Sequence, residues 1–415
     1  MTDWKKIRNK FSLKTEMERK IFNEKVKKLF QSYSQRINQK NSKQENGNGI
    51  YDRYVNPAIT RNNVPVFWEY DLNYETNPHL MKRLGVNTTF NAGAIKLNGK
   101  YLMVVRIEGF DVKSIFGVAE SPNGVDQWRF WDHPIVMPVN DHPEMNVYDI
   151  RLTQHEDGWI YGLFCAERKD QSQPNDSSAA LASCGMARTK DLKNWERLSD
   201  LKSKAAQQRN CVLHPEFVEG KYMIYTRPQS AFIETGNSGI CVGFSDSMEN
   251  ASIDEEIMMD PRTYHTVKEV KNGQGPPPIK TKKGWIHLAH GVRRTAAGLR
   301  YTLYLLLTDL EEPWKVVKRP SGHLIEPLHD ERVGDVSNVA FSNGWILDDN
   351  GTVFIYYASS DTRMHVATTT SEKLLDYVLN TPEDAGRTQL CAAQRDEMIV
   401  KNLAVLEKNF PNIQY

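Results

Sequence analysis

Five copies of one short pattern constrain the fold of this 415-residue chain more than any other feature. In each copy a polar turn containing a glycine is followed by a strand-forming run that is rich in aromatic residues. The turn glycines are separated by 59, 62, 64 and 67 residues, and they are Gly99, Gly158, Gly220, Gly284 and Gly351. A recurring interval of this kind indicates a repeated supersecondary unit. The chain is therefore predicted to be built from five similar modules.

Each module is predicted to consist of short β-strands. β-branched and aromatic residues dominate the runs that follow the turns, as in 101–105, 222–225, 301–307 and 353–357. Between residues 91 and 365 the sequence predicts no long helix that could cover a parallel sheet. We therefore expect an all-β fold, a five-bladed β-propeller over residues 51–370, whose long repeat interval implies extra loops. An all-β sandwich is the alternative, but it requires no five-fold repeat.

The two ends of the chain are predicted to be helical. Residues 1–50 form an arm in which apolar residues recur at roughly helical spacing, from Ile7 and Phe11 to Leu29 and Phe30. Such a helix can bind a membrane surface or nucleic acid, but its mixed charges favour packing on its own domain or on a second subunit. We expect a homo-oligomer formed through this arm, and a helical C-terminal extension over residues 371–415.

The overall charge and the cysteines restrict the class of partner. A formal net charge of +1 gives no reason to expect nucleic acid, a membrane or an acidic partner, so the expected ligand is a small molecule. The five cysteines are an odd number and lie far apart in the sequence, without the spacing of metal ligands. This pattern argues against both a disulfide framework and a zinc site. The N-terminus has no apolar run typical of a signal peptide. These features predict a cytoplasmic protein.

Asp149 is the candidate acid. It lies between the apolar residues Val147 and Ile150, beside Tyr148, on a run typical of an inner strand. Burial raises the pKa of a carboxyl group and a nearby cation lowers it, which is how a site tunes an acid for work near neutral pH. The alternative is a structural aspartate that caps the strand or pairs with Arg151.

Cationic side chains occur at matching places in the other modules. In a propeller the innermost strands line a central channel, so these residues are expected to converge. An unpaired guanidinium after an inner apolar strand is costly, so Arg106 and Arg227 are expected to meet an anion. Arg209, Arg227 and Lys271 together suit the oxygens of phosphate. The segment 273–279 is not a P-loop, because it precedes a strand, and it is interpreted as a rigid loop that directs Lys271.

A set of ordered motifs then resembles a known family. The motifs are Phe90-Asn-Ala-Gly-Ala-Ile95, Val147-Tyr-Asp-Ile-Arg151, Gln208-Arg-Asn-Cys-Val-Leu-His-Pro-Glu216, Tyr225-Thr-Arg-Pro228, Gly275-Pro-Pro-Pro-Ile279, Ala289-His-Gly-Val292 and Tyr356-Tyr-Ala-Ser-Ser-Asp-Thr-Arg363. They resemble the inverting β-mannoside phosphorylases of glycoside hydrolase family 130, over nearly everything from Arg53 to about Tyr377. The family fold is a five-bladed propeller, in agreement with the repeats.

The resemblance implies a role for each candidate residue. It makes Asp149 the general acid, acting through the 3-hydroxyl of the mannosyl unit. It implies a phosphate site and a mannosyl site; the first comprises Arg209, Asn210, Arg227, Lys271, His290 and Tyr301, and the second Asn91, Arg106 and Asp361. Without the resemblance, His290 is more simply interpreted as a core histidine. No metal or organic cofactor is expected, and inorganic phosphate is the co-substrate.

The implied reaction is reversible phosphorolysis of β-1,4-mannosyl-glucose to α-mannose 1-phosphate and glucose. A single carboxyl suffices because phosphate arrives already nucleophilic, whereas an inverting hydrolase needs a second carboxylate to activate water. Pro228–Phe232 and Gly275–Pro278 depart from the pattern of the mannosyl-glucose branch, which leaves the acceptor sugar open. The alternatives are a β-1,4-mannooligosaccharide phosphorylase, a β-mannosidase, and a non-catalytic sugar-binding propeller.

Overall fold

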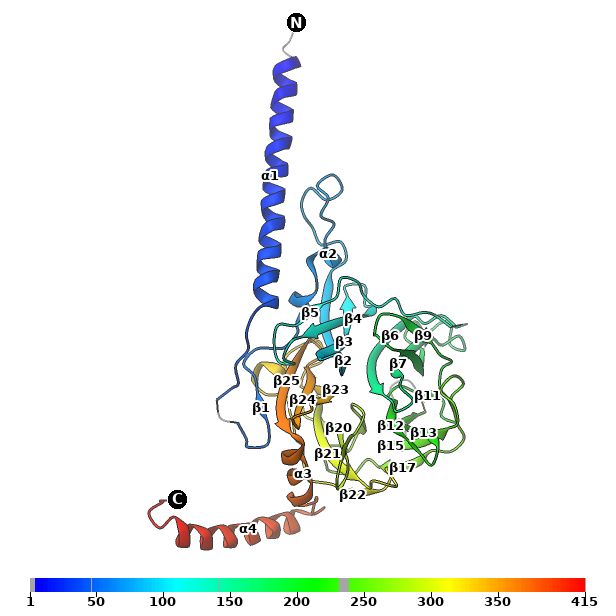
Figure 1. Cartoon of the computed structure of the whole chain (residues 1–415), viewed down its shortest axis with the longest axis vertical. Coiled ribbons are helices and arrows are strands. Elements are labelled where there is room, and N and C mark those ends of the chain that lie inside the picture. The colour runs from blue at the N-terminus through cyan, green and yellow to red at the C-terminus, as the bar shows by residue number, and fades with distance from the viewer. Residues whose placement is uncertain (1–3, 46, 141, 231–238, 415) are drawn as a thin grey trace.

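The computed structural model describes residues 4–45, 47–140, 142–230 and 239–414. Five antiparallel sheets stand around a common centre, with a long helix at one end of the molecule and a C-terminal helix at the other (Figure 1). The five-bladed β-propeller predicted from the repeats is confirmed. A membrane-crossing helix needs a longer apolar run than any helix in the described residues provides.

The first two blades are continuous four-stranded meanders, as expected for short strands joined by tight turns. Blade one consists of β2 (Val86–Leu97), β3 (Lys100–Gly109), β4 (Ser114–Ser121) and β5 (Arg129–Phe130). Blade two consists of β6 (Asn146–Gln154), β7 (Ile160–Lys169), β8 (Ala180–Thr189) and β9 (Trp195–Arg197).

Blades three and four carry additional short strands. Blade three contains β12 (Val212–Val218), β13 (Lys221–Thr226), β15 (Ile240–Ser245) and β17 (Ile257–Asp260). Two small pairs flank it, β10 (Lys202–Ser203) with β16 (Ser252–Ile253), and β11 (Gln207–Gln208) with β14 (Pro228–Gln229). Blade four contains β18 (Lys271–Gln274), β19 (Ile279–Thr281), β20 (Gly284–Thr295), β21 (Gly298–Thr308) and β22 (Val316–Lys318).

The N-terminal side of the chain completes the fifth blade. Its strands are β23 (Ala340–Leu347), β24 (Thr352–Ser359) and β25 (Arg363–Thr370), and β1 (Asp52–Arg53) pairs with β25 as the outermost strand. Because residues far apart in sequence share this sheet, the ring is closed by backbone hydrogen bonds. Three short helical turns lie outside the blades: η1 (Arg61–Asn63), α2 (Val66–Glu69) and η2 (His329–Arg332).

The repeated glycines lie where the sequence predicts turns. Four of them come just before β3, β7, β13 and β24, and Gly284 is the first residue of β20; each has a positive φ, which glycine adopts without steric cost. The core lies between the blades: five apolar clusters fill the five spaces between neighbouring sheets. Each blade is therefore held mainly by its two neighbours.

Three innermost strands bulge at corresponding places. The register shifts between Phe90 and Gly93 in β2, between Tyr148 and Arg151 in β6, and between Phe341 and Gly344 in β23. A bulge bends the strand and redirects the side chains next to it. The bulges therefore place side chains such as Asn91 and Asp149 at the centre of the ring.

The terminal helices differ in how they pack. α1 (Trp4–Ile37) ends at Ile37, earlier than the predicted end of the arm near residue 50. Its Phe22 is buried against Tyr74, with ring centroids 5.6 Å apart. α3 (Ser371–Asn380) buries Leu374 and Val378, whereas α4 (Thr388–Asn409) buries no residue. Of the helical extension predicted over residues 371–415, α3 buries side chains and α4 does not.

Candidate active site

The structure brings all ten candidate site residues to one cavity of about 250 Å³. The cavity receives at least one of these side chains from every blade, so the convergence expected of a propeller channel is observed. Inner strands supply Asn91 on β2, Asp149 on β6 and Lys271 on β18. Other strands or the segments that join them supply the remaining seven: Arg106, Arg209, Asn210, Arg227, His290, Tyr301 and Asp361.

Asp149 sits at the bulge of β6 with φ 60°, and Asn91 sits at the bulge of β2 with φ 47°. Asparagine and aspartate tolerate this left-handed backbone better than other non-glycine residues. The Asn91 side-chain amide donates to Asp149 Oδ1 at 3.0 Å, and Arg106 Nη1 donates to the same oxygen at 3.1 Å. The carboxyl group is thereby oriented by two neighbours on blade one.

Arg106 was expected to meet an anion, and two acids of the chain itself fill that role. Besides Asp149, Glu108 accepts a bond from Arg106 Nη2 at 3.0 Å. The guanidinium lies between two aromatic rings, with its Cζ 4.3 Å from the Phe90 centroid and 4.6 Å from the Tyr148 centroid. Arg106 is therefore held by both charge and stacking.

The alternative that Asp149 pairs with Arg151 is wrong. The buried Arg151 guanidinium donates to the backbone oxygen of Asp149 at 2.8 Å, not to its carboxylate. It also donates to the carbonyl of Gly275 at 3.2 Å and to the side chain of Asn210. Arg151 thus joins blades two, three and four around the cavity and leaves the Asp149 carboxylate to Asn91 and Arg106.

Arg227 has no acidic partner in the part of the chain that the structure describes. Its Nη1 lies 3.2 Å from His290 Nε2, and its Nη2 donates to Gln229 Oε1 at 3.2 Å. Burial, reinforced by the charges of Arg209 and Arg151, lowers the pKa of Arg227 to about 10. A buried cation in such surroundings is stabilised by any anion that enters the cavity.

His290 is a neutral hydrogen-bond donor in this arrangement. Burial and the nearby Arg227 lower the pKa of His290 well below its usual value, so the ring is uncharged. Because a guanidinium can only donate, Nε2 accepts from Arg227 and the ring proton resides on Nδ1. Nδ1 is buried and has no partner among the described residues. A ligand oxygen can satisfy it.

Lys271 completes the cationic group. Burial, together with Arg227 and Arg209, lowers the pKa of its ammonium to about 8. Its Nζ lies 5.4 Å from the centre of the Tyr301 ring. The interpretation of 273–279 as a rigid loop that directs Lys271 is only partly right: residues 275–278 are irregular, but Lys271–Gln274 form strand β18, paired with β20. Lys271 is positioned by the blade itself.

Gly273 permits the close packing of two side chains where blades three and four meet at the cavity. A Cβ at this position would lie 2.6 Å from Asn210 Nδ2 and 2.6 Å from His290 Cε1. Asn210 in turn donates to the carbonyl of Gln274 at 2.8 Å. Only glycine lets β18 approach these groups without displacing them.

Asp361 is a second carboxyl in the cavity. It follows β24 with φ 52°. Burial raises the pKa of Asp361 to about 7, the negative charge of Asp149 adds to the rise, and Arg106 opposes it. The cavity therefore holds two carboxyls in different surroundings, one at the bulge of β6 and one at the end of β24.

Four residues that the sequence did not assign to the site also line the cavity: Tyr148, Val336, Val339 and Phe341. Phe341 directly precedes the bulge of β23, as Phe90 and Tyr148 precede those of β2 and β6. An aromatic residue at the same place in three modules is a signal that the sequence contains. Val336 and Val339 lie in an irregular segment, and no comparable pattern marks them.

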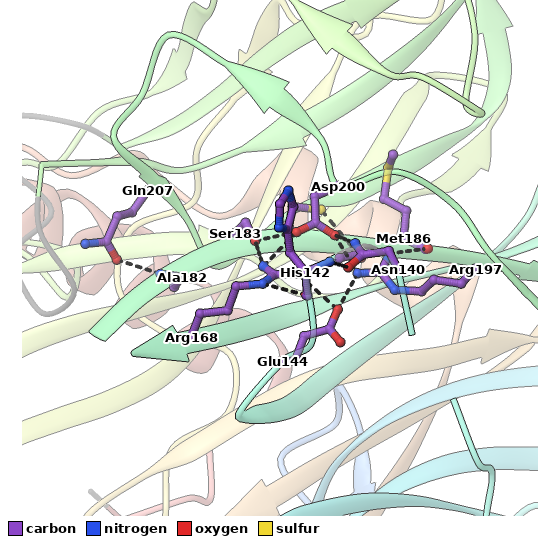
Figure 2. A network of polar contacts seen from close by, with 12 residues as sticks. Asn140, His142, Glu144, Arg168, Ala182, Ser183, Met186, Arg197, Asp200 and Gln207 are labelled. Atoms are coloured by element: carbon purple, nitrogen blue, oxygen red, sulfur yellow. Dashed lines mark hydrogen bonds and ion pairs between the residues drawn. The ribbon is translucent and has the colours of Figure 1, made fainter. Parts of the chain in front are cut away.

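A network of charged side chains fixes the segment that enters β6 (Figure 2). Arg168 donates to Asp200 at 2.8 Å and to Glu144 at 3.2 Å. Arg197 donates to the same Glu144 oxygen at 2.6 Å. Glu144 lies two residues before β6, so the network holds the start of the strand that carries Asp149. Two segments, Pro228–Phe232 and Gly275–Pro278, depart from the family pattern, and Ala231 and Phe232 of the first lie outside the described residues.

With this geometry in view, comparison with known proteins identifies the family. A family model described as beta-1,4-mannooligosaccharide phosphorylase matches residues 58–380. The chain belongs to glycoside hydrolase family 130. The resemblance drawn from the sequence motifs is thus confirmed, and the match spans all the candidate site residues.

Relatives of this family-130 chain include well-matched proteins. A 4-O-beta-D-mannosyl-D-glucose phosphorylase of Bacteroides fragilis is 58% identical over 93% of this chain and 100% of the relative. A Beta-1,4-mannooligosaccharide phosphorylase of Ruminococcus albus is 35% identical over 41% of this chain and 50% of the relative. A solved Listeria innocua Beta-1,2-Mannobiose phosphorylase shares the fold, with TM-score 0.64 and 21% identity over 82% of this chain and 99% of that structure.

Proposed function

We propose that this enzyme catalyses the reversible, inverting phosphorolysis of 4-O-β-D-mannosyl-D-glucose to α-D-mannose 1-phosphate and D-glucose. The substrate follows from the full-length similarity to the Bacteroides fragilis phosphorylase. The observation that carries the reaction type is the group of Arg209, Arg227 and Lys271 in the same cavity as Asp149. A hydrolase that uses water has no need for three cations beside its acid.

The proposed phosphate site suits a dianion. Arg209 and Arg227 offer planar forks, Lys271 offers an ammonium, and His290 offers its Nδ1 proton. The lowered pKa values of Arg227 and Lys271 reflect burial and mutual repulsion, which a bound dianion relieves. Asn210 and Tyr301 complete the site.

The proposed mannosyl site lies on the side of Asp149, with Asn91, Arg106 and Asp361. One phosphate oxygen forms a bond to the anomeric carbon while the bond to the glucose oxygen breaks on the opposite face, so the configuration inverts. Asp149 supplies a proton to the departing oxygen, relayed by the mannosyl 3-hydroxyl. The proton that phosphate gives up restores Asp149, so the proposed reaction needs phosphate as co-substrate and no further cofactor.

A second candidate differs only in the acceptor. The family model and the Ruminococcus albus relative carry the description beta-1,4-mannooligosaccharide phosphorylase. In that case mannose or a mannooligosaccharide would replace glucose as the product, with the same phosphate site. The lower identity and partial coverage of that relative favour the mannosyl-glucose substrate.

The test is incubation of the purified enzyme with mannosyl-glucose in the presence and absence of phosphate. We expect glucose and α-mannose 1-phosphate to form in equal amounts only with phosphate, as shown by phosphorus and proton NMR. β-1,4-Mannobiose is the matched second substrate, and faster phosphorolysis of it would favour the mannooligosaccharide alternative. Release of free mannose at the same rate without phosphate would overturn the phosphorylase assignment.

We further propose that the enzyme is a cytoplasmic homo-oligomer in which the terminal helices contact a second copy of the chain. α4 buries no residue, yet it carries Ile399 at 50% and Leu403 at 41% exposure, among other apolar side chains. Apolar helix faces of this kind mark interaction sites. The buried, unpaired thiols of Cys165, Cys184 and Cys211 suit a reducing compartment.

A further inference from the structure

Tyr148 links the two sides of the cavity. It is the residue before Asp149 on β6, and only 5% of it is exposed. Its ring lies beneath two guanidiniums, with Arg106 Cζ 4.6 Å and Arg209 Cζ 5.7 Å from the centroid. Arg106 contacts the acid, whereas Arg209 belongs to the proposed phosphate site. One aromatic side chain therefore packs against a cation of each subsite.

The Tyr148 hydroxyl makes two directed hydrogen bonds. It accepts from Arg209 Nη2 at 2.8 Å and donates to Glu167 Oε2 at 2.8 Å. A guanidinium only donates and a carboxylate only accepts, so the direction of both bonds is fixed. Burial raises the pKa of Tyr148 far above its usual value, so the phenol keeps its proton. The chain of contacts runs from Glu167 through the hydroxyl to Arg209.

Glu167 is a firm anchor for this chain of contacts. It lies on β7 in register with Asn146 of β6, and its backbone carbonyl accepts from the amide of Met145 at 2.8 Å. Its neighbour Arg168 belongs to the charged network that holds the entry to β6 (Figure 2). Both strands that carry the contact are thus fixed, and the position of the Tyr148 hydroxyl is fixed with them.

We propose that Tyr148 is a positioning residue for phosphate, which holds the Arg209 guanidinium in place through its hydroxyl while its ring supports Arg106. The proposal rests on the proposed role of Arg209 in binding phosphate. Because Arg209 is a long side chain, loss of the hydroxyl removes one of the contacts that restrict its rotamers, and phosphate binding must then supply that restriction. The ring contact with Arg106 does not need the hydroxyl. The two functions of the side chain can therefore be separated by one substitution.

The test is Tyr148→Phe in the full-length enzyme. A hydrogen bond to a charged group in a buried site corresponds to roughly 10-fold or more in affinity, so the KM for phosphate should rise by about that factor. The KM for mannose 1-phosphate in the synthetic direction should rise in parallel. The KM for the disaccharide should change less than about 2-fold, because the phenylalanine ring still packs on Arg106.

Tyr161→Phe is the matched control. Tyr161 lies on β7 of the same blade, is 1% exposed, and donates from its hydroxyl to Asp157 Oδ2 at 2.8 Å. The Tyr161→Phe variant loses a comparable hydrogen bond from a tyrosine hydroxyl to a carboxylate. Tyr161 does not line the cavity. We expect its substitution to lower the melting temperature and leave the KM values unchanged, so a purely structural effect is recognised.

Glu167→Gln tests the anchor. A neutral amide accepts more weakly than a carboxylate, so the KM for phosphate should rise less than in Tyr148→Phe. In the double variant Tyr148→Phe/Glu167→Gln the rise should match that of Tyr148→Phe alone, since the contact is already broken. Equal effects of Tyr148→Phe on both substrates, or an unchanged KM for phosphate, would overturn the proposal. A wild-type enzyme that acts without phosphate would instead overturn the proposed function.

Discussion

Arg106 Nη1 and Asn91 Nδ2 both donate to Oδ1 of Asp149, at 3.1 Å and 3.0 Å. Arg106 and Asp149 lie on neighbouring blades and form a partly buried ion pair beside the proposed reaction centre. The exposed fraction is 14% for the Arg106 side chain and 19% for that of Asp149. The ion pair orients the Asp149 carboxyl group, but it does not by itself exclude Asp361 as the acid. Substitution of each aspartate in turn distinguishes the two.

Asp149→Asn should abolish turnover while the fold and phosphate binding persist, because it removes a transferable proton and little volume. The expected loss in kcat is on the order of 100- to 10,000-fold or more. Asp361→Asn is the comparison, and it should mainly raise the KM for the disaccharide. Steady-state kinetics and a phosphate-induced thermal shift would measure both. Near wild-type turnover by Asp149→Asn would move the acid to Asp361.

Arg227→Ala should raise the KM for phosphate, and for mannose 1-phosphate in synthesis, far more than that for the disaccharide. A charge-assisted hydrogen bond contributes roughly 1.5–3 kcal/mol, which is about 10- to 150-fold in affinity. Arg227→Lys should recover only part of the loss, because an ammonium keeps the charge but not the planar fork. Equal changes for both substrates would contradict a phosphate role for Arg227.

The affinity for phosphate should fall as the pH rises through 8. In the free enzyme Lys271 has a pKa lowered to about 8 by burial and by Arg227 and Arg209, so above that pH it loses the charge that attracts the dianion. The KM for phosphate should therefore increase between pH 8 and 9.5. Lys271→Arg keeps its charge throughout this range and should remove the increase. Superimposable profiles of the two enzymes would show that Lys271 does not contact phosphate.

Gly273→Ala should weaken phosphate binding without contacting phosphate itself. Its Cβ would lie 2.6 Å from atoms of Asn210 and His290, so one or both must move. Loss of one or two such bonds predicts a rise of roughly 10- to 100-fold in the KM for phosphate. Gly220→Ala controls for a general loss of stability, because alanine is strained at this positive-φ turn although the space around it is open, and the turn does not line the cavity. Unchanged phosphate kinetics in Gly273→Ala would argue against these two residues as ligands.

Deletion of residues 1–37 should change the size of the assembly more than the chemistry. The deletion removes α1 but keeps residues 38–48, which contact the propeller through bonds such as that from Asn41 to Asp126. Light scattering gives the mass, and activity per subunit gives the chemistry. A matched deletion of residues 388–415 tests α4 separately. An unchanged mass in both variants would exclude a role of these helices in assembly.

The fold was predictable because each of the five repeats contains a turn glycine. These glycines have positive φ values that few other residues adopt, so the sequence shows where the turns lie. The convergence of the candidate residues on one cavity was predictable because equivalent positions of a propeller face its central channel. The hydrogen-bond partners within the cavity were not predictable. At the bulge between Tyr148 and Arg151, the Arg151 guanidinium donates to the backbone carbonyl of Asp149, so that Arg106 pairs with the Asp149 carboxylate. A one-residue irregularity in register leaves no mark in local sequence periodicity.

The repeated bulge has a consequence for how such a ring changes its chemistry. The position after the aromatic residue is Asn91 in β2 and Asp149 in β6, both with positive φ and both lining the cavity, whereas Ser342 in β23 donates its hydroxyl to the Tyr356 carbonyl instead. The backbone thus offers two equivalent positions in the cavity, and the identity of the side chain decides which of them holds a proton donor. New activities can arise on this scaffold by exchanging axial side chains, with the blades and their interfaces left untouched.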